Sequence, residues 1–122
     1  KQKIGYAISP PENEEMEVRG RDLVSGLPRK MKIKAEEICN TLAEPLSLIT
    51  EGVKVVLEKT PPELAADIIN KGIVMTGGGS LLKNFDHLIE EVTNISTCLG
   101  DDPSTCVVIG TGRALQSIEL LK

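Results

Sequence analysis

The fold of this chain is decided by a stretch of ten residues, IVMTGGGSLL at positions 73–82. Its apolar start predicts a short strand, and a helical pattern follows its three glycines. Adjacent glycines are costly to order, because each has more conformational freedom to lose than any other residue. A domain that keeps them needs either a tight strand-to-helix turn or the close approach of a phosphate or sugar.

The composition limits the class of protein. The 122 residues include one Tyr, one Phe and no Trp, so the core must be aliphatic. An RNA-stacking surface needs aromatic faces, and a net charge of −4 disfavours any nucleic-acid partner. The three cysteines lack Cys-x-x-Cys spacing and there is one histidine, so we expect reduced, mostly buried thiols, a cytoplasmic protein and no metal site. No apolar run approaches the ~20 residues that span a bilayer.

The first half of the chain predicts a β-hairpin followed by helices. Apolar and charged residues alternate over residues 16–34, around a glycine-containing connection. The basic residues between positions 29 and 34 are better explained as the solvated face of this hairpin than as a partner patch. From Glu36 the apolar period becomes helical, and Pro45 predicts either two helices or one helix kinked at Glu44.

The second half predicts a helix and then two parallel strands. The helix begins near Thr60, which caps it, with Glu63 completing a capping box, and it ends at Gly72 in the left-handed conformation. The strands cover residues 73–76 and 95–99. A second helix, capped by Asn84 or Ser80, joins them as the crossover of a parallel pair.

The last predicted helix begins at Asp102-Pro103, with Asp102 as its cap and the proline in its first turn. Its expected core-facing residues are Val108, Leu115, Ile118 and Leu121. The glycines of Gly110-Thr111-Gly112 favour close packing of this helix on a sheet or another helix. The alternative is a backbone surface held near the glycine loop, a name we use for residues 77–80.

Two parallel strands are too few for a sheet that is buried on both faces. We therefore expect the chain to be a piece of a larger protein, or to pair with another chain that completes the sheet.

Taken alone, the glycine loop favours a ligand-free turn over a nucleotide contact. No Gly-Lys-Ser/Thr follows it, as a Walker A loop requires, and the spacing of the dinucleotide fingerprint is absent. Ser80 lacks the context of a nucleophile elbow, and His87 is expected to be a surface helix residue and not a catalytic one. No carboxylates compose an acid–base pair or a metal cage, so the residues indicate an α/β binding piece and not a complete enzyme.

Five segments occur in the order in which one known family has them. They are EVRGRDLVSGLP (17–28), TPPELAADI (60–68), TGGGSLL (76–82), DDP (101–103) and GTGRAL (110–115). Together they resemble the bacterial actin homologues of the MreB/Mbl family over nearly the whole chain, far more specifically than the glycines alone.

The resemblance implies a C-terminal fragment of an actin-like, rod-shape-determining ATPase, a fold in which two domains flank a nucleotide cleft. Residues 1–58 would form part of subdomain IIB, and residues 59–122 the C-terminal part of subdomain IIA. It also implies which residues bind ATP. Those on the ribose and α-phosphate side would be Gly77, Gly78, Gly79 and Ser80. Lys1 would face the adenine.

The resemblance also implies what this chain lacks. The phosphate clamps, the Mg²⁺-positioning acid, the water-orienting residue and the membrane-binding loop of the family belong to its N-terminal part. We therefore expect this chain alone to hydrolyse no ATP, to bind none and to bind no membrane. The parent would use ATP with Mg²⁺, form filaments with copies of itself, work with the cell-wall elongation machinery and lie at the inner face of the cell membrane.

Two positions depart from the family pattern, and two other functions stay open. Asn84 stands where the family often has glycine, and Lys34-Ala35 replaces the usual Ser/Thr cap before the long helix. The chain could instead be a nucleotide-free interaction or polymerisation module. It could also be a piece of another ATPase of the actin superfamily, although the hairpin and the Pro-Pro-Glu-Leu helix start speak against that.

Overall fold

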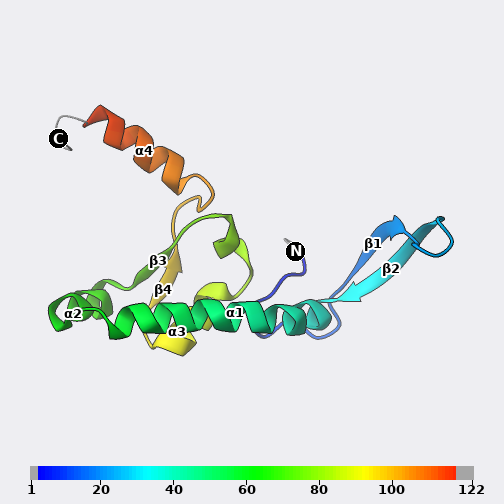
Figure 1. The fold of residues 1–122 in the computed structure, drawn as a ribbon, viewed down its shortest axis with the longest axis horizontal. Helices are drawn as coiled ribbons and strands as arrows, with labels where there is room; N and C mark the ends of the chain where they lie inside the picture. Colours follow the sequence, from blue (N-terminus) through cyan, green and yellow to red (C-terminus); the bar gives the residue numbers. More distant parts are fainter. Residues whose placement is uncertain (1–2, 118–122) are drawn as a thin grey trace.

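The helix α1 (Ala35–Glu58) runs along the length of the molecule, with the hairpin at one end, α2 (Pro62–Lys71) near the other and α3 (Phe85–Thr93) packed along it (Figure 1). The computed structural model describes residues 3–117. The remaining elements are β1 (Glu15–Arg21), β2 (Pro28–Lys34), β3 (Ile73–Met75), the 3₁₀ helix η1 (Gly78–Leu81), β4 (Thr97–Leu99) and α4 (Cys106–Gln116). The predicted α/β class is confirmed.

The strands β1 and β2 form the predicted antiparallel hairpin, which projects from one end of α1 (Figure 1). Its register places Glu15 opposite Lys34. Exposed ion pairs cross the strands, from Lys30 to Glu17 at 3.3 Å and from Lys32 to Glu15 at 3.2 Å. Such exposed pairs stabilise little, and their side chains lie at the surface of this chain, as expected of either a solvated face or a partner patch.

The helix α1 continues through Pro45 as one helix of 24 residues, so the alternative of two helices is wrong. Buried Leu46 and Thr50 hold this part of the helix in place, and packing of this kind outweighs the cost of a proline. At the start of α1, the Lys34 amide donates to Oε2 of Glu37 at 3.0 Å. A glutamate in the first turn thus satisfies a free backbone donor without a Ser/Thr cap.

The start of α2 differs from the prediction. The Thr60 hydroxyl donates to the Val56 carbonyl at 2.8 Å and so belongs to the end of α1, while Pro61 is the N-cap of α2 without a side-chain cap. At its other end Gly72 has the expected positive φ of +79°, but its ψ of −175° is extended and not left-handed helical. A Cβ at Gly72 would lie 2.7 Å from the Ser96 carbonyl oxygen, so the approach of β4 requires this glycine.

The strands β3 and β4 pair in parallel, with Ile73 opposite Thr97 and Met75 opposite Leu99, which confirms the crossover topology. Both strands have three residues and are shorter than predicted. Asn84 precedes α3 with φ +60°, which explains why glycine suits this position. Asn84 occupies the predicted N-cap position of α3, but its side chain makes no capping hydrogen bond. Its Nδ2 donates instead to the Ile8 carbonyl at 3.0 Å.

The core joins three parts of the chain. Its buried cluster consists of Ala7, Leu46, Phe85 and Ile89, from the N-terminal segment, α1 and α3. The N-terminal segment, which the sequence did not reveal as part of the core, is held by a parallel bridge between Tyr6 and Lys83. The two expected portions, residues 1–58 and residues 59–122, therefore both contribute side chains to one apolar cluster.

The last helix, α4, begins at Cys106 with Thr105 as its N-cap, three residues later than the predicted cap Asp102. Asp102 lies instead in a turn with φ +44°. Within the described residues α4 stands apart from the rest of the chain (Figure 1), and Val108 and Leu115 are exposed, so their predicted core contacts are wrong here. The other two expected core residues, Ile118 and Leu121, lie outside the described residues.

The two glycines of α4 have no close neighbours in this chain. A Cβ added at Gly110 or Gly112 would meet nothing within 4 Å among the described residues. The close packing that these glycines indicate is therefore absent from residues 3–117.

Candidate functional site

The glycine loop lies at the carboxyl ends of the two parallel strands. Directly after β4 the Gly100 amide donates to the Met75 carbonyl at 2.9 Å, and after β3 the Gly77 amide donates to the Pro103 carbonyl at 2.7 Å. The segments that follow the two strands therefore form one edge. In parallel α/β sheets this edge is where ligands bind.

Gly77 is required by the backbone itself. Its φ of +85° and ψ of +161° fall in a region that is essentially restricted to glycine. The tight turn from β3 into η1 explains this residue without any ligand.

Gly78 and Gly79 have no such conformational requirement. Neither has a positive φ, both are exposed, and a Cβ at either would meet nothing within 4 Å among the described residues. They are also the first two residues of η1, and the first amides of a helix have no acceptor inside it. The loop therefore has two amides without an acceptor inside η1, on a surface that side chains leave free.

Ser80 stabilises the glycine loop through hydrogen bonds from a buried position. Its side chain is buried, its hydroxyl donates to the Gly77 carbonyl at 2.7 Å, and its amide donates to the same oxygen at 3.2 Å. It is the N-cap of neither η1 nor α3, so the alternative prediction of Ser80 as a helix cap is wrong.

Lys1, the remaining predicted contact, lies outside the described residues. The segment that leads from it is fixed by Lys83, a residue that the sequence reasoning missed. The ammonium group of Lys83 donates to the Lys3 carbonyl and, at 3.0 Å, to the Tyr6 hydroxyl, and it lies 3.7 Å from Oε1 of Glu14. The hydrogen bond with Tyr6 and the charge of Glu14 raise the pKa of Lys83, although desolvation opposes them. The sequence contains no motif that predicts these contacts of Lys83, because its partners lie about 70 to 80 residues away in the chain.

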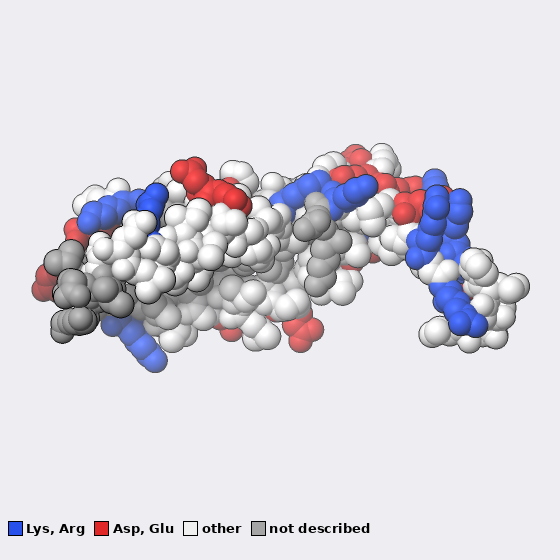
Figure 2. All heavy atoms as spheres, turned by 90° about the horizontal axis from the view of Figure 1, so that it is seen from above, with Lys and Arg blue, Asp and Glu red and all other residues white. Residues whose placement is uncertain are grey.

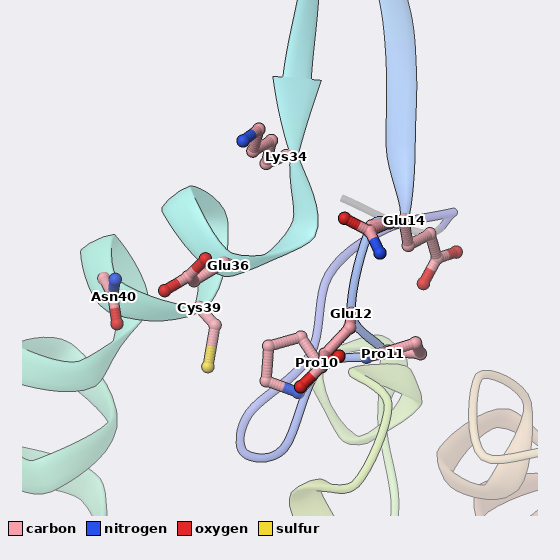
Figure 3. A pocket seen from close by; sticks show the side chains of 9 residues that line it. Pro10, Pro11, Glu12, Glu14, Lys34, Glu36, Cys39 and Asn40 are labelled. Carbon is pink, nitrogen blue, oxygen red and sulfur yellow. The ribbon is translucent and has the colours of Figure 1, made fainter.

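Two hollows lie away from the glycine loop. The larger, of about 550 Å³, is situated between residues 10–14 and the start of α1 (Figure 3). The thiol of Cys39 points towards it from α1. The second, of about 420 Å³, is formed by the far part of the hairpin. The residues that line these two hollows do not include the glycine loop, whose Gly78 and Gly79 are exposed.

The end of the hairpin is the most exposed apolar surface of the described chain. Leu23 and Val24 are 98% and 100% exposed. Basic side chains gather along the hairpin, with uncharged atoms at its end (Figure 2). Fully exposed neighbouring apolar residues of this kind mark interaction surfaces.

Asp22 organises this exposed end. Its Oδ1 accepts hydrogen bonds from the amides of Val24 at 2.8 Å and Ser25 at 3.1 Å, and its Oδ2 pairs with Arg29 at 3.0 Å. These hydrogen bonds, first that of Ser25 and then those of Val24 and Arg29, hold the pKa of Asp22 below its usual range. The carboxylate therefore presents the two apolar side chains on a fixed turn.

The remaining candidate groups offer no catalytic arrangement within residues 3–117. His87 is exposed on α3. Cys98 is exposed, which makes the expectation of mostly buried thiols wrong for this residue, while Cys39 and Cys106 are half-buried. The described part of the chain contains no group of three or more potential metal ligands and no helix long and apolar enough to cross a membrane.

Comparisons with known proteins give one consistent result. A family model described as MreB/Mbl protein matches residues 1–122. The chain is 48% identical over 120 residues to the cell shape-determining protein MreB of Escherichia coli (strain K12), covering 98% of this chain and 35% of that protein. It is 44% identical over 119 residues to the cell shape-determining protein Mbl of Bacillus cereus, covering 98% of this chain and 36% of that protein.

Solved structures give the same match. The crystal structure of MreB5 of Spiroplasma citri bound to ADP superposes with a TM-score of 0.86 at 40% identity, over 96% of this chain and 36% of that one. MreB5 bound to AMPPNP gives a TM-score of 0.85 at 40% identity, over 97% of this chain and 35% of that one. The chain thus spans about a third of the length of the relatives that it matches.

Proposed function

The chain belongs to the MreB/Mbl family, and we propose that it is the C-terminal part of a cell-shape-determining, filament-forming, actin-like ATPase. In this proposal the glycine loop forms one wall of the ATP cleft, on the ribose and α-phosphate side. Residues 1–58 contribute to subdomain IIB and residues 59–122 to subdomain IIA. The relatives of known structure are bound to ADP and AMPPNP, which supports a nucleotide ligand for the whole protein.

The observation that carries this proposal is the pair Gly78 and Gly79. The turn itself accounts for Gly77, but two further glycines with open space around them have no structural explanation. A side-chain-free surface with free amides suits a ribose and a phosphate, because both need close approach and the phosphate needs N–H donors. Ser80 then supports the loop, and Lys1 contributes on the adenine side.

The rest of the reaction belongs to parts of the whole protein outside this chain. In this proposal the hydrolytic groups lie in those other parts, so this part alone would not hydrolyse ATP. Mg²⁺, the attacking water and any membrane contact would be held by those other parts. The whole protein would act in the cytoplasm at the inner face of the cell membrane, with its own copies and the cell-wall elongation machinery as partners.

The test is Gly78→Val in the whole protein, measured as the dissociation constant for ATP. We expect binding to weaken at least about tenfold, since a branched side chain would occupy the space of the ligand. The fold should survive, because a Cβ at Gly78 meets nothing within 4 Å among the described residues. Gly52→Val, on an equally open site of α1, is the matched control and should bind ATP normally. Normal ATP binding by Gly78→Val would show that the role assigned to the loop is wrong.

A second measurement uses this chain alone. Calorimetric titration with ATP should show no binding at millimolar nucleotide, because one wall of a cleft leaves most of the ligand in water. Tight binding by the isolated chain would contradict the proposal that other parts of the protein complete the site.

The exposed hairpin end favours a second candidate function, a nucleotide-free interaction or polymerisation module. Leu23 and Val24 would then bury their side chains against another protomer. The two candidates differ in nucleotide dependence. Assembly of the whole protein that needs ATP supports the first, and assembly that is equal with and without nucleotide supports the second.

A further inference from the structure

We propose that Lys83 is a positioning residue of the nucleotide site, which fixes the N-terminal segment (residues 3–8) against the end of the glycine loop. The inference rests on the proposed function, because it concerns the spacing of two walls of the same site. Lys83 follows Ser80 by three positions, and Lys3 follows Lys1 by two. One side chain therefore joins the two stretches of chain that carry the predicted nucleotide contacts.

The side chain of Lys83 makes several contacts with this segment and its continuation. Its ammonium donates to the Lys3 carbonyl and to the Tyr6 hydroxyl, and it lies 4.5 Å from the centre of the Tyr6 ring. The Glu14 carboxylate, at 3.7 Å, adds an opposite charge. A Lys ammonium has three donors, and here the carbonyl, the phenol and the carboxylate surround it.

The backbone places Lys83 in register with the segment. The Ala7 amide donates to the Lys83 carbonyl at 2.8 Å, and the Lys83 amide donates to the Gly5 carbonyl at 3.2 Å. The next residue, Asn84, donates from Nδ2 to the Ile8 carbonyl at 3.0 Å. This is an isolated bridge and not a strand pair, so few backbone bonds fix the segment and the side chain must supply the remainder.

Burial gives the contact a fixed geometry. Ile4 and Ala7 are buried, so the segment cannot slide along the surface without exposing apolar area. Lys83 adds direction to this anchor, because its bonds to Lys3 and Tyr6 fix the end of the segment that leads to Lys1. Without it, residues 3–8 would lose their fixed position next to the end of the glycine loop.

The experiment is Lys83→Met in the whole protein, with KM for ATP and kcat measured separately. Methionine keeps the length of the side chain and removes all three donors. We expect KM to rise about tenfold while kcat changes less than about twofold, because small misplacements weaken binding and the hydrolytic groups lie elsewhere. A purely structural role would reduce the amount of active protein, and thus kcat, without moving KM.

Three further variants make the test specific. Lys83→Arg keeps charge and donors and should return KM to within about threefold of the wild-type value. Lys54→Met, at an exposed site of α1, is the matched control and should change neither constant. Tyr6→Phe removes the phenol but keeps the ring, and should raise KM about threefold, which tests the proposal even if Lys83→Met fails to fold.

The outcomes separate the two proposals. A wild-type protein that neither binds nor hydrolyses ATP would overturn the proposed function. A wild-type protein that does both, with Lys83→Met and Tyr6→Phe both unchanged in KM, would overturn the positioning role alone. Loss of kcat without a rise in KM would also overturn it, since that pattern belongs to a structural role.

Discussion

The amide of Gly77 donates a hydrogen bond to the carbonyl oxygen of Pro103, at 2.7 Å. The bond ties the glycine loop, which follows β3, to the turn that follows β4 and leads into α4. After this amide the chain turns with φ +85° and ψ +161° at Gly77, a conformation that other residues rarely adopt. The shape of the loop is thus set by a partner 26 positions away as well as by its own glycines.

Gly77→Ala should lower the free energy of unfolding of the chain by about 1–3 kcal/mol. A Cβ is strained at this combination of φ and ψ, and relief of the strain would break the bond to Pro103. Gly78→Ala is the matched control and should stay within about 0.5 kcal/mol, since its site is open. Urea unfolding of both variants gives the comparison. Equal losses would mean that the loop conformation differs from the one described.

Asp22 should make the hairpin end sensitive to acid. Its pKa is lowered by the amides of Ser25 and Val24 and by Arg29, so its charged form stabilises the folded turn. That stabilisation is fully present above the ordinary carboxyl value of about 4 and is lost as the pH falls through the lower folded value. NMR titration of the Val24 and Ser25 amide signals measures it. Asp22→Asn should remove the titration, and an unchanged curve in that variant would assign the effect to another group.

Ile89→Ala should destabilise the chain by about 2–4 kcal/mol. Ile89 is buried in the cluster that joins the N-terminal segment, α1 and α3, and its removal leaves a cavity between them. Val56→Ala, on the exposed side of α1, should cost less than about 1 kcal/mol. Thermal or urea unfolding distinguishes the two. Similar losses at both sites would contradict the position of the core.

The double change Leu23→Ser with Val24→Ser should weaken assembly of the whole protein without affecting its stability. Both side chains are almost fully exposed, so the isolated protomer loses no packing. An interface at the hairpin end would lose two apolar contacts, and the concentration needed for assembly should rise about tenfold or more. Sedimentation measures that concentration. The control is Leu48→Ser on the exposed face of α1, and assembly that is unchanged in the double variant would remove the hairpin end as a contact.

Most elements were predictable because their signals are local. The alternation over residues 16–34 gave the hairpin, the apolar period after Glu36 gave α1, and the pattern around the glycines gave two parallel strands. Element ends were less predictable. The Thr60 hydroxyl bonds to the end of α1, and Asp102 adopts a positive φ in a turn. Neither the bonding partner nor the backbone conformation is encoded in a sequence pattern.

The candidate site was predictable only in part. The family resemblance is confirmed by the family match, and it directed attention to the glycine loop. The separate roles of the individual loop residues could be assigned only from the structure. Gly77 serves the turn, Ser80 holds it from inside, and only Gly78 and Gly79 remain free for a ligand.

The sequence by itself determined the family, the α/β class and the order of elements, because motifs and periodicity are properties of neighbouring residues. The tertiary structure alone decided that the N-terminal segment joins the core and that Lys83 holds it beside the glycine loop. It also decided that α4 is without a packing partner among residues 3–117. These features depend on contacts between residues far apart in the chain, and such contacts leave no periodic trace in the sequence.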